Sequence, residues 1–212
     1  MLKNKNSIFF NLNCVDLYKT NFLLQMNYSF KEEGKFKYVE IGEGRPIIIL
    51  HGLMGGLSNF NGVTEFFNQN GYKVVLPELP LYSLPLLSTN VKSFAEYLKD
   101  FIDFLGFNDV ILLGNSLGGH IGLLYTKLYP AKVKALVITG SSGLYESAMG
   151  SGYTKRSDYE VMKSKVQEVF YDPEVASKEM VDEVFASVND RSKLIKTLAI
   201  AKSAIRHNMA KD

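Results

Sequence analysis

Apolar and polar positions along the first part of the chain predict strands and helices that alternate. Strand patterns cover residues 35–41, 46–50, 72–76, 110–113 and 133–139. Helical spacing of apolar residues covers 58–69, a stretch from Asn90 or Ser93 to Leu105, and 117–128. Short, continuous apolar runs are typical of buried parallel strands. The alternation therefore predicts an α/β fold, a mostly parallel sheet with helices on both faces.

The pattern changes after Gly143, where helical spacing replaces strand signals. Residues 159–171, 177–188 and 192–209 predict helices, and Asn189 or Asp190 would cap the last one. The chain thus divides into an N-terminal extension (1–25), a βα core (26–142) and a helical segment (143–212). We expect this segment to lie over the C-terminal edge of the sheet. Its apolar positions, such as Val166 and Leu198, would face a pocket or the core.

Composition narrows the class of protein. The chain has 212 residues, 46% hydrophobic and 22% charged, which suits one domain with or without a lid. A net charge of +2 gives no reason to expect nucleic acid or a membrane as partner, and no segment approaches the ~20 apolar residues of a membrane helix. Cys14 is the only cysteine, which excludes an internal disulfide and fits the cytoplasm. We expect neither a cofactor nor a metal ion.

The strongest candidate for chemistry is residues 114–119, Gly-Asn-Ser-Leu-Gly-Gly, between a predicted strand and a predicted helix. This is the G-x-S-x-G pattern in its structural context. A tight turn would raise the Ser116 hydroxyl above the sheet, and Gly114 and Gly118 would leave room for neighbouring backbone. The alternatives are an incidental glycine-rich turn or a dinucleotide site. A dinucleotide site is disfavoured because the middle position is serine and the next strand ends at Thr139 without an acid.

A second glycine-rich loop, residues 51–56, follows the strand 46–50 and reads His-Gly-Leu-Met-Gly-Gly. The backbone N–H groups of Leu53 and Leu117 could together stabilise an oxyanion. His51 could be a catalytic base, but its position at a strand end favours, with Gly52, support of this loop.

These two motifs and the order of elements resemble the α/β-hydrolase superfamily over residues 27–212. The resemblance implies that Ser116 is the nucleophile, that Leu53 and Leu117 donate to the oxyanion, and that the helical segment is a cap. The Gly-Asn-Ser-Leu-Gly-Gly form is similar to that of single-domain esterases and of carbon–carbon bond hydrolases of diketones. One departure is residues 78–83, Glu-Leu-Pro-Leu-Tyr-Ser, where relatives often have Asp-x-Pro-Gly-x-Gly.

The family order is serine, acid, histidine, with the last two on loops after the final two strands. We call the tight turn at Ser116 the elbow. His207 is the one histidine that follows the predicted helix 117–128 after this elbow, and its place in another predicted helix favours packing or exposure over catalysis. His120, four residues after Ser116, is expected to be structural. We therefore expect the acid, the histidine and the C-terminal strands to be absent from these 212 residues, and the chain alone to be inactive.

Three functions follow as hypotheses. The first is a serine hydrolase that cleaves a small or medium ester through an acyl-enzyme. The second is carbon–carbon bond hydrolysis of a dicarbonyl compound, and the third is a non-catalytic protein that keeps the fold. A small molecule is the expected partner in the first two, and the oligomeric state stays open.

Overall fold

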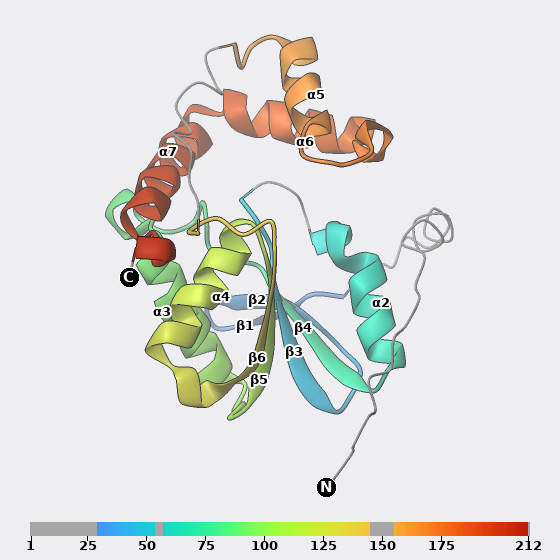
Figure 1. Ribbon diagram of the computed structural model, residues 1–212, viewed down its shortest axis with the longest axis vertical. Helices are drawn as coiled ribbons and strands as arrows, with labels where there is room; N and C mark the ends of the chain where they lie inside the picture. The colour runs from blue at the N-terminus through green and yellow to red at the C-terminus, as the bar shows by residue number, and fades with distance from the viewer. Residues whose placement is uncertain (1–28, 54–56, 145–154, 212) are drawn as a thin grey trace, which may run out of the picture.

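A computed structural model describes residues 29–53, 57–144 and 155–211 (Figure 1). A six-stranded sheet has the order β1-β2-β4-β3-β5-β6. The strands are β1 (Lys31–Glu33), β2 (Phe36–Ile41), β3 (Arg45–Leu50), β4 (Tyr72–Pro77), β5 (Val110–Asn115) and β6 (Val133–Thr139). From β4 to β6 neighbouring strands are parallel, whereas β1 and β2 form an antiparallel edge. The mostly parallel sheet is as predicted. β1 was not predicted, because its three exposed charged residues carry no apolar alternation.

Helices cover both faces of this sheet (Figure 1). Helix α2 (Asn61–Gln69) packs on one face, and α3 (Val91–Phe104) and α4 (Leu117–Leu128) pack on the other. Strand β3 shows how the sequence divides the core, since alternate side chains of a strand point to opposite faces. Ile47 and Ile49 face the α2 side, while Ile48 and Leu50 face α3 and α4. All four are at most 1% exposed, so β3 is buried on both faces.

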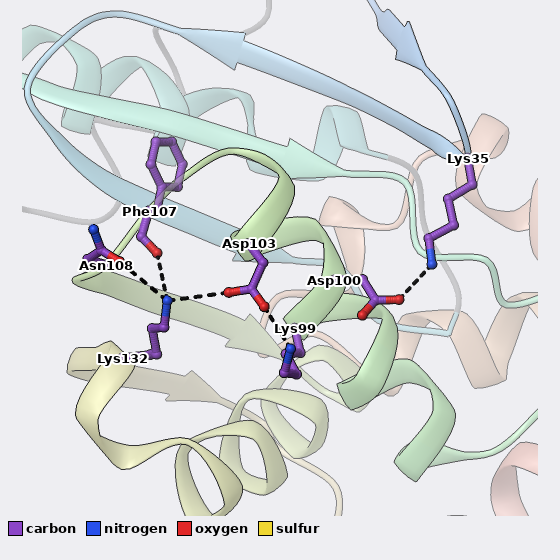
Figure 2. A network of polar contacts seen from close by, with 7 residues as sticks. All are labelled: Lys35, Lys99, Asp100, Asp103, Phe107, Asn108 and Lys132. Atoms are coloured by element: carbon purple, nitrogen blue, oxygen red, sulfur yellow. Dashed lines mark hydrogen bonds and ion pairs between the residues drawn. The ribbon is translucent and has the colours of Figure 1, made fainter.

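Helix α3 begins at a local capping signal and ends beside a network of charged side chains. The Asn90 side chain accepts a hydrogen bond from the Ser93 N–H at 3.0 Å, which identifies Asn90 as the N-cap. At the other end, Asp103 lies within 2.7 Å of Lys99 and 3.3 Å of Lys132. Figure 2 shows the Lys132 ammonium between Asn108 and Asp103, with contacts to both. The network joins the end of α3 to the short 3-10 helix η4 (Pro130–Lys132) that precedes β6.

The helical segment contains α5 (Tyr159–Gln167), α6 (Lys178–Asn189) and α7 (Arg191–Arg206). Helices α5 and α6 lie beyond the C-terminal ends of the parallel strands, while α7 runs back alongside the core to α3 and α4 (Figure 1). Asp190 is the N-cap of α7 and accepts from Ser192 and Lys193. Helices are thus found where they were predicted; residues 145–154 of the segment and the extension 1–25 lie outside the described residues.

Leu198 on α7, predicted to face a pocket or the core, is 46% exposed and therefore does not belong to the core. That it faces a pocket stays a prediction. The helix instead buries Thr197, Ile200, Ser203 and Ala204. Of these, Ile200 and Ala204 belong to the apolar core on the α3 and α4 side of the sheet.

Hydroxyl groups attach α7 to the core. The Val91 N–H, at the start of α3, donates to Ser203 Oγ at 3.0 Å in a buried position. The hydroxyls of Tyr82 and Thr197 lie 3.3 Å apart, and Lys196 Nζ donates to the Tyr82 carbonyl. These contacts make α7 the link between the helical segment and the core. Within the described ranges, no helix is both long and apolar enough to span a bilayer.

Candidate active site

Ser116 occupies a sharp turn between β5 and α4. Its backbone has φ 53° and ψ −117°, and it is the only non-glycine residue with positive φ in the described part of the chain. Non-glycine residues rarely adopt this conformation, which is about 1–3 kcal/mol unfavourable and persists only where the surroundings impose it. The Ser116 N–H donates to Thr139 O at 3.0 Å, and its carbonyl accepts from the amides of His120 and Ser142, each at 3.2 Å. The strained turn is therefore held from β6 and from within α4.

Glycines allow this turn to form, as their positions in the motif predicted. A Cβ at Gly118 would lie 2.1 Å from Leu50 O, and one at Gly114 would lie 2.5 Å from Gly118 O. A Cβ at Gly119 would come within 2.7 Å of Ser141 Oγ. Because β3 and β6 flank β5, these glycines let the first turn of α4 lie between the ends of both neighbouring strands.

The two amides predicted for the oxyanion belong to segments that meet at Ser116. Leu117 is the first residue of α4, so its N–H is among the amides without a carbonyl partner inside the helix. The loop after β3 passes beside the nucleophile, since a Cβ at Gly52 would lie 3.3 Å from Ser116 Cβ. Leu53 follows Gly52 directly. The next three residues of this loop, Met54, Gly55 and Gly56, lie outside the described residues, and donation from the Leu53 N–H to the oxyanion stays a prediction.

His51 is buried, and its hydrogen bonds determine its tautomer. Its Nε2 accepts from the Leu79 N–H at 2.9 Å, so this nitrogen carries no proton. Its Nδ1 carries the proton and donates to Gly52 O at 2.8 Å. Burial lowers the pKa of His51 below its ordinary 6.5, which favours this neutral form. Both nitrogens are engaged, and His51 connects the loop after β3 to the loop after β4; proton transfer would require one of these bonds to break.

His120 is completely buried on the flank of α4. Its Nε2 lies 2.8 Å from the carbonyl oxygen of His207 and must be the donor, because a carbonyl only accepts. Its Nδ1 is then an acceptor, 3.4 Å from Ser142 Oγ. His51 and His120 thus hold opposite tautomers. His207, which is partly buried just beyond α7, takes part through its backbone carbonyl.

Carboxylates after Ser116 belong, within the part of the chain that the structure describes, to the helical segment. Several have local tasks: Asp158, Asp172 and Asp190 cap helices. Asp182 accepts a hydrogen bond from Tyr159 at 2.6 Å and pairs with Lys178. Among the described residues, no group of three or more His, Cys, Asp or Glu side chains could hold a metal ion.

Two neighbours of the nucleophile were not singled out from the sequence. The Asn115 amide donates to Thr139 O at 3.1 Å and to Thr139 Oγ1 at 3.0 Å, which ties the turn to the end of β6. Ser142 contacts both the Ser116 carbonyl and the His120 ring. The available signal was the run Ser141-Ser142-Gly143 directly after a parallel strand, at the sheet edge where active sites form.

Comparison with known proteins agrees with this architecture. Residues 45–180 match the family described as alpha/beta hydrolase fold. The chain belongs to this family.

Similar curated proteins include two hydrolases. It is 34% identical over 111 residues to a 2-hydroxy-6-oxononadienedioate/2-hydroxy-6-oxononatrienedioate hydrolase of Pseudomonas putida, which covers 49% of this chain and 39% of that protein. It is 25% identical over 182 residues to the 2-hydroxy-6-oxo-6-phenylhexa-2,4-dienoate hydrolase of Comamonas testosteroni, covering 77% and 63% of the two chains. The match thus spans about two fifths of the first of these relatives.

Among solved structures, MGS-MChE2 is an alpha/beta hydrolase enzyme from the metagenome of lagoon sediments of Mar Chica, Morocco. It is 58% identical, with a TM-score of 0.69 over 87% of this chain and 69% of that one. The predicted superfamily and fold class are therefore confirmed, and the chain is of a hydrolase family.

Proposed function

We propose that the protein is a serine hydrolase that cleaves small or medium esters through an acyl-enzyme on Ser116. The observation that carries the proposal is the strained backbone of Ser116, φ 53°, at the N-terminus of α4. In this scheme Ser116 Oγ attacks the ester carbonyl, and the N–H groups of Leu53 and Leu117 stabilise the oxyanion. The tetrahedral species then expels the alcohol, which takes up the proton removed from Ser116, and water hydrolyses the acyl-enzyme to release the carboxylic acid and restore the Ser116 hydroxyl.

The attack needs a base that takes the Ser116 proton, since a neutral hydroxyl is a weak nucleophile. His51 and His120 are poor candidates because each already has partners on both ring nitrogens. The proposal therefore assigns the base to neither of them. It requires no cofactor or metal ion, takes a small molecule rather than nucleic acid or a membrane as partner, and places the protein in the cytoplasm.

The surroundings of the turn support an uncharged carbonyl substrate. The side chains that make hydrogen bonds beside Ser116 include Asn115, Thr139 and Ser142, none of which carries a charge. The dipole of α4 points its positive end at the position where negative charge would develop. A helix N-terminus with uncharged polar neighbours can stabilise an oxyanion as it forms during the reaction.

Carbon–carbon bond hydrolysis of a dicarbonyl acid is the second candidate. It is favoured by the names of the relatives, such as the Pseudomonas putida hydrolase at 34% identity. Both reactions begin at a carbonyl carbon and produce an oxyanion, so the elbow serves either one. The acyl-enzyme is specific to our first proposal.

The test uses the full-length protein and a fluorophosphonate probe. We expect labelling at Ser116 that disappears in Ser116→Ala and persists in Ser187→Ala, a serine on α6. Turnover of p-nitrophenyl esters of increasing acyl length is then compared with cleavage of a 2-hydroxy-6-oxo-dienoic acid. Faster cleavage of the dienoic acid would favour the second candidate. Labelling that survives Ser116→Ala would refute the assignment, and an unlabelled, inactive protein would favour a non-catalytic role.

A further inference from the structure

The two ends of the helical segment meet at the ring of His120. Ser142 and Gly143 lead from β6 into the segment, and His207 and Met209 follow its last helix, α7. The Met209 N–H donates to Gly143 O at 2.6 Å, which joins the two ends directly. We call these residues, with His120, the His120 cluster.

The ring of His120 fills the centre of this cluster. His120 is 0% exposed, and a Cβ on Gly143 would lie 2.5 Å from its Cδ2. Gly143 also has φ 86°, a conformation that side chains disfavour. Glycine is therefore required for the chain to pass this closely over the imidazole.

Hydrogen bonds continue from the cluster to the nucleophile. His120 Nε2–H donates to the His207 carbonyl at 2.8 Å, and Ser142 Oγ lies 3.4 Å from the acceptor Nδ1. The Ser142 N–H in turn donates to the carbonyl of Ser116 at 3.2 Å, and so does the N–H of His120 itself. A continuous path thus runs from the end of α7 through the imidazole to the strained residue.

We propose that His120 is a positioning residue, which sets the backbone of Ser116 according to where α7 docks. This inference deepens the proposed function and rests on Ser116 being the nucleophile. His120 exchanges no proton with substrate in this role. It fixes the Ser142 loop, which holds the Ser116 carbonyl, so losing the imidazole would relax the turn and misplace Oγ.

The experiment compares His120→Phe, which fills the space without hydrogen bonds, with His207→Ala, which keeps the carbonyl that His120 uses. In the full-length protein, well below each variant's unfolding temperature, we expect His120→Phe to lower kcat and the fluorophosphonate labelling rate about ten- to a hundredfold, because small misplacements of a reacting atom have effects of this size. KM should stay unchanged. We expect His207→Ala to behave as wild type, and His120→Gln, which retains a donor, to recover part of the rate.

Two further measurements keep the test decisive. Ser142→Ala removes only the hydroxyl and should slow labelling less than His120→Phe; it replaces His120→Phe if that variant does not fold. Hydrogen exchange of peptides covering residues 140–144 and 207–211 should be faster in His120→Phe than in wild type, whether or not the protein is active.

The outcomes separate the two proposals. Wild-type labelling and kcat in folded His120→Phe would overturn the positioning role while leaving Ser116 as nucleophile. An equal loss in His207→Ala would also overturn it, because the side chain rather than the carbonyl would then matter. If wild type is not labelled, the proposed function fails, and the exchange data alone decide whether His120 couples the two ends.

Discussion

The βα core and the helical segment are held together by different means. In the core, Ile48, Ile49 and Leu50 are fully buried, and the functional turn depends on backbone contacts that only glycine permits, as at Gly118. Helix α7 adds Ile200 and Ala204 to this core, but it also buries hydroxyl side chains, such as Ser203, that hydrogen-bond to the core. The turn at Ser116 has room for no side chain at Gly118, so only one residue type fits there. A hydrogen bond of α7, in contrast, can be replaced by another of similar strength. The core should therefore tolerate change far less than the helical segment.

The largest effect on stability is expected from a methyl group added at the elbow. Gly118→Ala places a Cβ 2.1 Å from Leu50 O, a backbone atom that cannot rotate away. We expect a loss of about 2–5 kcal/mol in the free energy of unfolding, measured by urea denaturation. The matched control is Gly122→Ala on the same helix, where the Cβ meets the flexible end of Leu136 at 3.1 Å. Its effect should lie within about 1 kcal/mol, and equal losses in both variants would show that the elbow is not specially constrained.

A deletion in the helical segment should have a smaller effect. Ser203→Ala leaves the buried N–H of Val91 without its partner, which we expect to destabilise the protein by about 1–3 kcal/mol. Exposed Ser192→Ala, in the first turn of the same helix, is the control. Hydrogen exchange should increase in α7 and at the start of α3 but not in β3 or β5. Equal increases throughout the sheet would contradict the separation of the two regions.

The pH dependence of stability should reveal the buried His51. Its pKa is lowered in the folded protein, so the unfolded chain binds more protons as the pH falls below about 6.5. Stability should therefore fall on acidification, with a slope of at most about 1.4 kcal/mol per pH unit. Asp103 and Glu40 have lowered pKa values, through hydrogen bonds from Lys99 and Lys73 respectively, and their contribution is lost only below about pH 4.5.

Thermal unfolding from about pH 8 to about pH 5 thus separates the contribution of His51 from those of Asp103 and Glu40. We expect His51→Gln to reduce the slope in this range. An unchanged slope would mean that His51 titrates alike in both states and that its burial is relieved on protonation.

The smallest effect is expected in the surface network of Figure 2. Asp103 pairs with Lys99 and Lys132, but all three side chains are more than a third exposed. Exposed ion pairs contribute at most about 1 kcal/mol and are screened by salt. Asp103→Asn should therefore shift the unfolding free energy slightly at low salt and not at all near 1 M salt. A salt-independent loss would indicate that the network fixes the turn before β6 by geometry rather than charge.

Patterns that repeat locally could be predicted from the sequence, whereas contacts between distant segments could not. The four-residue apolar run Ile47–Leu50 indicated a strand buried on both faces, and the spacing of Gly114 and Gly118 indicated the turn around Ser116. The partners of His120 could not be found this way: His207 is 87 residues away and contributes a carbonyl, which every residue type possesses. Leu198 lies outside the core although it is apolar, because α7 buries Thr197 and Ser203 on its inner face, which apolar spacing alone does not indicate.

The hydrogen bond between Gly143 and Met209 has a consequence for exchanging parts of the protein. Because the N–H and carbonyl that bracket the helical segment are 2.6 Å apart, the segment leaves and rejoins the core at nearly one point. A segment with adjacent ends can be replaced by a longer or shorter one at little entropic expense, since closure depends only weakly on loop length. Chimeras that keep residues up to Gly143 and from His207 onward should thus fold with foreign helices between them, provided that the last helix keeps the buried face of α7, with Ile200, Ser203 and Ala204. The same core could then carry helical segments of different length and sequence.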